Sequence, residues 1–434
     1  MNLGRLILAL VVMAAFLALL NFLLWRRSSV TFGLKTKGRR ALAIALGAPF
    51  AATLFFRGLG SKLPMDFGRP LAVAASSAEL GVAIAASFIG LFLGIRWAAE
   101  RITKQARGAK NESASGAVYT KEASFGSEKN DKTEAAIAPE TNAAAAPETR
   151  VKDLAPALSR RTFVEQAAFG SAAFVGGSSA VYGSIFGRRD YEVTTVPMPV
   201  PGLSKAADGF TIVQLSDIHL GQMVGEVEAR IAEDLVRNAK GNLIVLTGDL
   251  IDHDVRYTTA LGTLVRRLSA IAPVVAIPGN HDHYTGVDAV LETVRAAGGT
   301  TLMNQSAFPL GKKSGFALLG VDDLWAEKLG GGPDLEAAVA HAQSDLPRIL
   351  LCHNPKVFVE TAGKVAVQLS GHTHGGQVNI GLRPADLVLR HGYIAGLYET
   401  NGSRIYVNRG FGTAGPAARV GAPPEVSRIV LVSA

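Results

Sequence analysis

Cysteine is almost absent from this chain, since Cys352 is the only cysteine among 434 residues. A single cysteine excludes an internal disulfide bond. It does not identify the compartment, because many exported proteins have no disulfide either. The length exceeds that of one ordinary domain, so more than one structural unit is expected.

The second half of the chain has no excess of basic residues. Residues 191–434 contain 20 Lys and Arg against 23 Asp and Glu, whereas residues 1–190 contain 24 against 13. The net charge of +8 and the pI of about 9.5 therefore originate in the first half. A basic first half followed by a mildly acidic second half is not the pattern of a nucleic-acid-binding protein, so no nucleic-acid partner is expected.

Long apolar runs are concentrated near the N-terminus, and the mean hydropathy of the chain is positive at +0.24. The three runs are residues 6–24, which include Asn21, a somewhat short run at 41–56, and residues 71–97, which contain Glu79. Their lengths predict a membrane domain with three transmembrane helices over residues 1–104. A carboxylate such as Glu79 is a functional candidate there, although near the start of a segment it can reach the membrane surface.

Lys and Arg residues between the runs predict the orientation. Six follow the first run, three separate the second run from the third, and five follow the third. The positive-inside rule therefore places the N-terminus outside and residues 97 to about 160 in the cytoplasm. Residues 105–158 are rich in small and polar residues and poor in large apolar ones, which predicts a flexible cytoplasmic linker.

A pair of arginines, Arg160 and Arg161, precedes a weakly apolar run over residues 167–186. Two interpretations of residues 159–190 are open: a twin-arginine export signal in an internal position, or a fourth transmembrane helix with flanking arginines. Both keep the arginines inside and place the C-terminal half of the chain outside. The run lacks a small-x-small cleavage site, so an uncleaved anchor is expected, although basic residues just after the run mildly oppose this orientation.

From residue 191 the pattern is that of a soluble α/β domain. Strand-like and helical segments alternate in its first half, and strands dominate its second half. Strands are predicted at residues 210–216, 242–247, 273–277, 316–321, 348–352, 364–370, 404–407 and 428–432, and helices at 224–239, 259–271 and 287–297. This order predicts two sheets packed together and flanked by helices.

Polar side chains follow five of these strands. In chain order the groups are Asp217-Ile218-His219, Gly248-Asp249-Leu250-Ile251-Asp252, Gly279-Asn280-His281-Asp282-His283, Cys352-His353-Asn354-Pro355 and Gly371-His372-Thr373-His374. In open α/β sheets, ligands bind at the carboxyl ends of the strands. Oxygen donors mixed with imidazoles suit Mn, Fe or Zn better than Ca or Mg alone. The number of donors, with one carboxylate able to bridge, fits two divalent metal ions better than one.

This series resembles the calcineurin-like metallophosphoesterase family, whose pattern is D-x-H, G-D-x-x-D, G-N-H-[DE], H and G-H-x-H. The resemblance covers about residues 208–434, and all five motifs match. Segments 351–355, 371–377, 406–412 and 419–425 are similar to a membrane-anchored subgroup with twin-arginine leaders. The resemblance implies an α/β fold, a two-sheet αββα metallophosphoesterase sandwich over residues 191–434, preceded by transmembrane helices.

The resemblance also implies a role for each motif residue. One metal ion would be held by Asp217, His219 and His374, the other by Asn280, His353 and His372, and Asp249 would bridge the two. His281 and its neighbour Asp282 are expected to be the catalytic pair. His281 would protonate the leaving alkoxide, whereas Asp282, like Asp252, would orient the groups around the metal ions.

Several other polar residues are candidates of a weaker kind. Arg409 and Arg419 can either bind the substrate phosphate or form structural pairs. His253 and His283 fit no motif role and are expected at the surface or rim of the site. Asp322 and Asp323 are expected to cap a turn rather than contact a metal-bound water, and Cys352 to be a buried strand residue.

These observations predict a membrane-anchored, two-metal phosphohydrolase in the inner membrane, multi-pass, with its catalytic domain on the periplasmic or extracytoplasmic side. Its partners would be the membrane and a phosphorylated small molecule or lipid. The subgroup resembles enzymes that cleave the pyrophosphate of UDP-2,3-diacylglucosamine in lipid A synthesis. A lipid substrate fits the anchor, but UDP-linked precursors are cytoplasmic. The alternative is a non-catalytic signalling or scaffold protein that retains the fold, and the complete set of donors argues against it.

Overall fold

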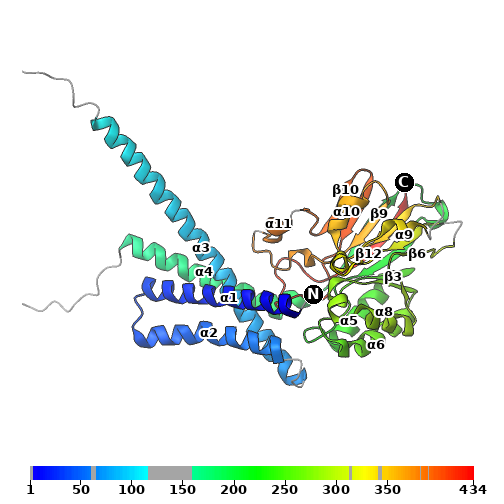
Figure 1. Cartoon of the computed structure of the whole chain (residues 1–434), viewed down its shortest axis with the longest axis horizontal. Helices are drawn as coiled ribbons and strands as arrows, with labels where there is room; N and C mark the ends of the chain where they lie inside the picture. The colour runs from blue at the N-terminus through cyan, green and yellow to red at the C-terminus, as the bar shows by residue number, and fades with distance from the viewer. Residues whose placement is uncertain are drawn as a thin grey trace, which may run out of the picture.

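The computed structural model describes residues 3–59, 65–115, 159–311, 315–340, 345–381, 383–389 and 391–434. Long helices from the first half of the chain lie together on one side, and a two-sheet domain built from the second half lies at one end of them (Figure 1). The long helices are α1 (Leu3–Thr31), α2 (Thr36–Leu59), α3 (Met65–Ser115) and α4 (Arg160–Ile185). Each of the four helices contains one of the apolar runs identified in the sequence.

Among the residues described, Leu71–Gln105 is the one helical stretch that is long and apolar enough to cross a membrane. The four-span arrangement therefore stays a proposal. Helix α3 continues to Ser115, so the first residues of the predicted linker are helical. The rest of the predicted linker, residues 116–158, lies outside the described residues.

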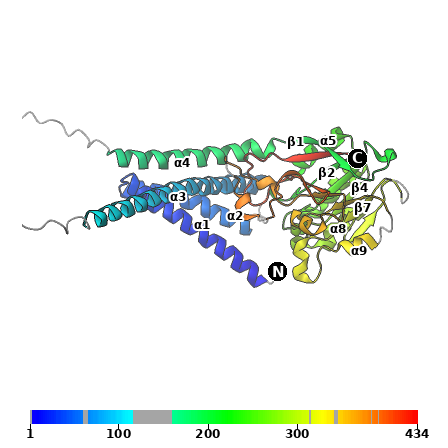
Figure 2. The ribbon, with the colours of Figure 1, turned by 90° about the horizontal axis from the view of Figure 1, so that it is seen from above.

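Helices α3 and α4 run antiparallel and in close contact (Figure 2). The side chains of Ser77 and Ser184 hydrogen-bond at one end, and Arg96 pairs with Glu165 at the other. Between them, a Cβ on Gly176 would collide with the carbonyl oxygen of Gly81, so only small residues permit this separation. Small residues thus decide how these two helices pack.

One interpretation of the sequence placed the side chain of Glu79 at the membrane surface. In the structure this side chain points into the helix bundle instead. Glu79 is buried, and its Oε2 accepts a hydrogen bond from Asn21 Nδ2 at 3.4 Å. Asn21 of the first apolar run and Glu79 of the third therefore meet inside the bundle. A buried carboxylate needs such a partner because burial removes its hydration.

The C-terminal domain contains two six-stranded sheets, with strand orders β1-β12-β2-β3-β4-β5 and β10-β11-β9-β8-β7-β6. The strands of the first sheet are β1 (Glu192–Val200), β2 (Thr211–Leu215), β3 (Leu243–Thr247), β4 (Val274–Ile277), β5 (Thr300–Thr301) and β12 (Glu425–Ser433). Those of the second are β6 (Gln305–Ala307), β7 (Ala317–Gly320), β8 (Arg348–Leu351), β9 (Val367–Ser370), β10 (Gly396–Thr400) and β11 (Ser403–Val407). The predicted two-sheet α/β fold is confirmed.

One apolar core fills the space between the sheets, and a second lies under the helices of the first sheet. The helices over the first sheet are α5 (Glu226–Ala239), α6 (Thr258–Ser269) and α8 (Val287–Ala296), and those beside the second are α9 (Leu335–Ala340) and α10 (Phe358–Thr361). In α5 the buried residues Ala229, Ala232, Val236 and Ala239 recur with helical spacing, which gives the helix one apolar face. Strands β2, β3 and β4 are buried along their whole length because both faces are covered.

The sequence missed the weaker elements at the margins of the sheets. Strands β5, β6 and β10 were not expected, nor was the short helix α7 (Asn280–Thr285). Strand β1 begins at Glu192, before the extended segment predicted from Pro197. It lies at the edge of its sheet, where proline is tolerated because one side of the strand needs no hydrogen-bond donors.

Candidate metal centre

The five motifs meet because their strands share a direction. Strands β2, β3 and β4 are parallel in the first sheet, and β8 and β9 are parallel in the second. Their carboxyl ends lie at one edge of the sandwich, and each motif begins where its strand stops. The backbone leaves the extended conformation abruptly there, since five of the expected ligands have a positive φ: Asp217, His219, Asp249, His372 and His374. Such strain in non-glycine residues is typical of functional sites.

One cluster consists of Asp217, His219 and His374, all of them buried, with potential ligand atoms within 4.8 Å of one another. The Nε2 atoms of His219 and His374 face each other at 3.2 Å. His374 Nε2 lies 3.4 Å from Asp217 Oδ1. These atoms converge on a single point, as the ligands of a metal ion do.

A second cluster consists of Asp249, His353 and His372, again within 4.8 Å. His372 Nδ1 lies 3.2 Å from His353 Nε2, and His353 Nε2 lies 3.4 Å from Asp249 Oδ2. The other nitrogen of His353, Nδ1, donates to the carbonyl oxygen of Thr247 at 2.8 Å. That hydrogen bond fixes the ring and leaves Nε2 for a metal ion.

Asp249 connects the two clusters. Its Oδ2 atom lies 3.4 Å from His353 Nε2 in the second cluster and 3.5 Å from His219 Nε2 in the first. Burial alone would raise the pKa of Asp249, but the imidazole of His353 holds it well below its usual range. Asp249 is therefore an anion placed between two groups of imidazoles, which is where a bridging ligand belongs.

The unpaired buried atoms and the pKa values of the two clusters are independent evidence that these residues fit metal ions. Asn280 Oδ1 and His219 Nδ1 are buried, with no hydrogen-bond partner among the described residues. Burial lowers the pKa of His219 and of His372 to about 4, which keeps both imidazoles neutral, whereas the carboxylate of Asp249 raises the pKa of His353. Because buried polar atoms are normally paired, an unpaired amide oxygen next to His281 in the chain is available to a cation.

His281 lies beside both clusters and is held by a carboxylate. Its Nδ1 atom is 3.1 Å from Asp252 Oδ1, and its backbone N–H donates to Asp249 Oδ1 at 2.8 Å. Its ring centroid is 4.5 Å from that of His219. Burial opposes the protonated ring, but the hydrogen bond to Asp252 raises the pKa of His281 above its ordinary value. An imidazole whose protonated form is stabilised in this way can donate a proton.

Asp282, expected as a catalytic residue that orients the groups around the metal ions, contacts backbone N–H groups of two loops. It is fully buried, and it accepts hydrogen bonds from the backbone N–H groups of Leu250, Ile251 and Gly279 at 2.9, 3.3 and 2.9 Å. Burial raises its pKa to about 7. Asp282 thus joins the loop after β3 to the loop after β4, and it is not placed to contact a substrate.

The two candidate arginines, Arg409 and Arg419, form hydrogen bonds and ion pairs with other residues of the protein. Arg419 is fully buried and donates to backbone carbonyls that include those of Arg409 and Gly412, while its Nη2 lies 3.1 Å from His374 Nδ1. Arg409 pairs with Glu192 at 2.7 Å and with Glu425 at 2.9 Å. Of the two alternatives that the sequence left open, these contacts and the burial of Arg419 favour structural pairing for both arginines.

The remaining candidates divide between interior and rim. His283 was expected at the surface, but its side chain is buried and its Nε2 lies 2.7 Å from Asp322 Oδ1. Asp323 caps a turn, as expected, by accepting from the Trp325 N–H at 2.8 Å. Cys352 is buried, also as expected. The side chain of His253 is 61% exposed, and its ring centroid lies 4.5 Å from that of His281, which is a rim position.

Sequence reasoning missed the aromatic side of the site. The ring of Tyr284 lies 5.3 Å from His281 and 4.9 Å from Trp325, measured between centroids. The side chain of Asn280 hydrogen-bonds Tyr284, which leaves the amide oxygen for a metal ion. Tyr284 stands only three residues from His281, and that proximity to a motif was the available signal. Trp325 comes from a distant segment and carried no signal.

A two-sheet sandwich with two clusters of carboxylate, imidazole and amide groups at the carboxyl ends of its strands defines a metal-dependent phosphoesterase. Residues 210–376 match the family described as calcineurin-like phosphoesterase. The chain belongs to the calcineurin-like metallophosphoesterase family, and it is a metal-dependent hydrolase of phosphoric esters.

Three relatives illustrate the similarity. The metallophosphoesterase YkuE of Bacillus subtilis is 32% identical over 64% of this chain and 98% of its own length. The phosphodiesterase YaeI of Escherichia coli is 34% identical over 51% of this chain and 82% of its own. A transmembrane protein with a metallophosphoesterase domain from Danio rerio is 33% identical over 59% of this chain and 60% of its own.

Proposed function

We propose that this chain is a membrane-anchored phosphohydrolase with two divalent metal ions. Asp217, His219 and His374 would hold one ion, and Asn280, His353 and His372 would hold the other. Asp249 would contact both. The observation that carries this proposal is the position of Asp249 Oδ2, at 3.4 and 3.5 Å from an imidazole nitrogen of each cluster. The mixture of oxygen and imidazole donors favours Mn, Fe or Zn.

When bound, the metal ions would polarise the phosphoryl oxygens and lower the pKa of the attacking water. The protein supplies the remaining chemistry. Asp249 keeps the two clusters together, and Asp252 orients the His281 ring through its Nδ1 atom. His281 then gives a proton to the leaving oxygen from its other nitrogen. The complete donor set and the presence of this acid favour an enzyme over a scaffold that only retains the fold.

The membrane assignment rests on the helices and on the transmembrane relative. In this proposal residues 1–104 and 159–190 anchor the protein, and residues 191–434 form the catalytic domain outside the cytoplasm. A lipid-linked or cell-envelope phosphoester or pyrophosphate is the substrate class that such an anchor serves. UDP-2,3-diacylglucosamine is the specific candidate, and it requires a catalytic domain that faces the cytoplasm.

Removal of the metal ions should abolish most of the hydrolytic activity of the full-length protein. After treatment with chelator, we expect hydrolysis to fall about 10³-fold, because the metal ions supply several kcal/mol of transition-state stabilisation. Activity should return with Mn²⁺ or a similar ion. The measurement is hydrolysis of a phosphomonoester, a phosphodiester and a nucleotide-sugar pyrophosphate by the metal-free and reconstituted protein. Undiminished activity in excess chelator would contradict the proposed metal dependence. The ester that the reconstituted protein hydrolyses fastest identifies the substrate class.

The C-terminus should lie outside the cytoplasm. A phosphatase reporter that folds only outside, fused after Ala434, should be active, whereas a cytoplasmic fluorescent reporter fused there should be dark. The reason is the excess of basic residues in the loops that the positive-inside rule keeps inside. A reporter in the loop at Gly33 is the internal control, since it should give the opposite result. Reversed signals at both positions would place the site in the cytoplasm and favour the UDP-linked substrate.

A further inference from the structure

A short helix beside the metal centre exposes its apolar side chains. Helix α11 (Ala385–Val388) lies in the segment between His374 and β10. Leu387 is 87% exposed and Val388 is 75% exposed, and Leu387 is the most exposed large apolar side chain of the described residues. Neither packs into a core of the catalytic domain. Leu387 and Val388 therefore form an exposed apolar patch, which is the kind of surface that binds a membrane or another protein.

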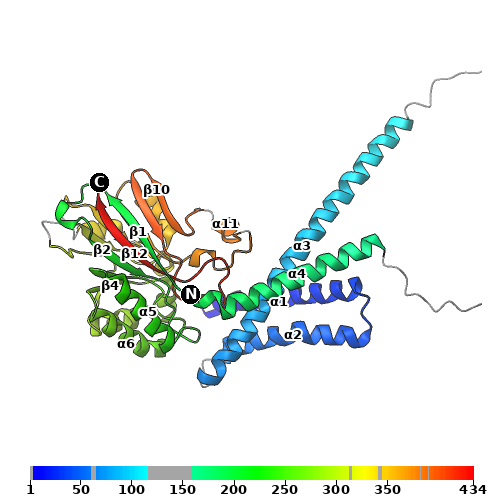
Figure 3. The same ribbon diagram turned by 180° about the vertical axis from the view of Figure 1, so that it is seen from behind.

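The segment that carries α11 is joined to the membrane helices by a short series of contacts. The Asn379 N–H donates to the Val420 carbonyl at 2.7 Å, and the neighbouring Arg419 N–H donates to the Gly183 carbonyl of α4 at 3.0 Å. The Ala417 N–H lies 3.5 Å from Ser76 Oγ of α3. In Figures 1 and 3, α11 accordingly lies on the side of the catalytic domain that faces the helices.

In the proposed membrane anchoring, the end of α4 marks the level of the bilayer surface. Its last residues include the exposed apolar side chains Tyr182 and Ile185, and the charged pair Arg188 and Arg189 follows. Apolar and aromatic residues followed by arginines are the usual boundary between lipid and water. The contact between Gly183 and Arg419 therefore lies at this boundary, and α11 is only a few residues away from it through the Val378–Val420 bridge.

We propose that α11 inserts into the surface of the bilayer that holds α1–α4, so that the metal centre operates at the lipid headgroups. This rests on the proposed membrane anchoring. A lipid bilayer is the occupant that the geometry favours, because α11 exposes Leu387 and Val388 beside the ion pair of Arg383 and Asp386, and apolar side chains next to charged ones are typical of a segment at a membrane surface. Asn379 links α11 to the metal-binding loop, since its Nδ2 donates to the Gly375 carbonyl at 3.0 Å.

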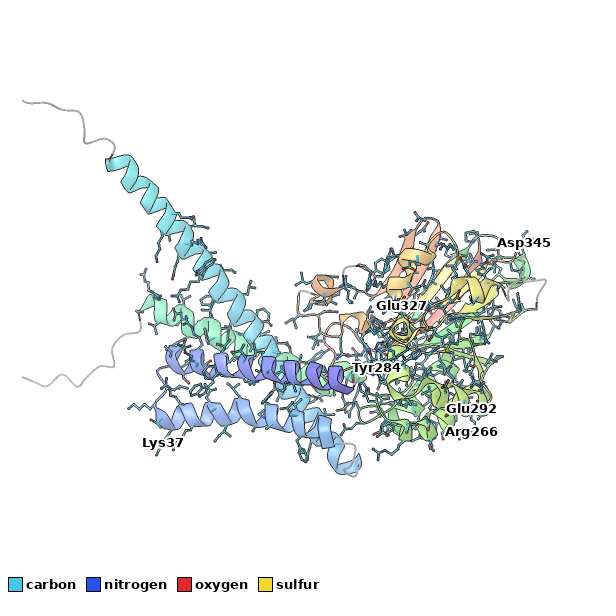
Figure 4. All side chains as sticks on the ribbon, in the orientation of Figure 1. Lys37, Arg266, Tyr284, Glu292, Glu327 and Asp345 are labelled. Carbon is cyan, nitrogen blue, oxygen red and sulfur yellow. The ribbon has the colours of Figure 1, made fainter. Side chains whose placement is uncertain are left out.

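An exposed residue at the rim of the site lies near the same side of the domain. Tyr284, which lies beside His281, is on the edge of the catalytic domain nearest the helices in Figure 4. A phosphate attached to a lipid headgroup could therefore meet the metal ligands without its acyl chains leaving the membrane. The inference names the substrate class of the proposed activity: a phosphoester or pyrophosphate that stays anchored in lipid.

A fluorescence experiment on the full chain tests the contact directly. Val388→Cys is labelled with an environment-sensitive dye, which the chain's own Cys352 does not take up because it is buried. The protein is placed in phosphatidylcholine nanodiscs with one copy per disc, with and without lipids spin-labelled near the headgroup. The control is Val359→Cys on α10, which is 65% exposed and lies farther from the helices (Figure 1). We expect quenching at position 388 and little at 359.

Equal quenching at the two positions would overturn the proposal. A blue-shifted dye at position 388 that spin-labelled lipid does not quench, but that responds to protein density in larger vesicles, would assign α11 to a second copy instead. Because this measurement needs no activity, it stands even if the proposed reaction fails.

An activity measurement tests the consequence. The double variant Leu387→Asp with Val388→Asp should lower kcat/KM about tenfold or more for a phospholipid phosphoester in vesicles. Hydrolysis of soluble nitrophenyl phosphate should be unchanged, because the metal ligands are intact. An equal loss on both substrates, or no loss on either, would contradict the role of α11. If the parent protein hydrolyses neither ester, the proposed function is contradicted. The quenching experiment still shows whether α11 inserts into the bilayer surface.

Discussion

Replacing Asp249 by Asn is expected to be the most damaging single change at the metal centre. The substitution removes a negative charge that faces an imidazole of each cluster, at 3.4 and 3.5 Å. It preserves shape, and the amide oxygen can still accept from the His281 N–H, so the fold has no reason to fail. We expect the loss of about one metal ion per chain or more, and a fall in kcat/KM of about 10³-fold or more.

The measurement is metal content by elemental analysis together with kcat/KM for a soluble phosphoester. Asp288→Asn, an exposed carboxylate on α8, is the matched control and should retain both. The single-cluster variants His219→Ala and His372→Ala should each keep more metal than Asp249→Asn does. Full metal content with activity within tenfold of the parent would show that Asp249 does not bridge the two sites.

Replacing His281 by Gln should lower turnover while leaving metal bound. As a general acid the imidazole contributes about 10²–10⁴-fold. Its contribution depends on the leaving group, because an alkyl or sugar alkoxide needs a proton whereas a nitrophenolate leaves as a stable anion. The defect should therefore increase as the pKa of the leaving group rises. The measurement is kcat for a series of esters with leaving groups of graded pKa, with metal content determined in parallel.

His253→Gln is the matched control, since His253 lies against the ring of His281 but is mostly exposed and contacts the site only at its rim. It should change kcat by less than the His281 variant at every leaving group. Asp252→Asn should show a weaker form of the same leaving-group dependence, because it loosens the His281 ring without removing it. A uniform defect for all esters, or recovery with added metal, would assign His281 to the support of the metal ions.

The strands and the polar groups at their ends could be predicted from the amino-acid sequence. Buried parallel strands have a strong apolar pattern, and their carboxyl ends must meet at one edge of a sheet, so donors such as Asp217, Asp249 and Asn280 could be brought together without a structure. The length and polarity of the N-terminal segments likewise predicted long helices. These features depend on local sequence and on rules of topology, both of which are visible along the chain.

Which polar residues face the site became clear only from the packing of the folded chain. His283 and Arg419 have the composition of functional residues, yet one pairs with Asp322 and the other is enclosed by backbone carbonyls. Asp282 occupies a motif position and still serves as a connection between loops. The link from α4 through Arg419 to His374 joins segments that are remote in sequence. Side-chain partners across such separations depend on how whole elements pack, and no local pattern encodes that packing.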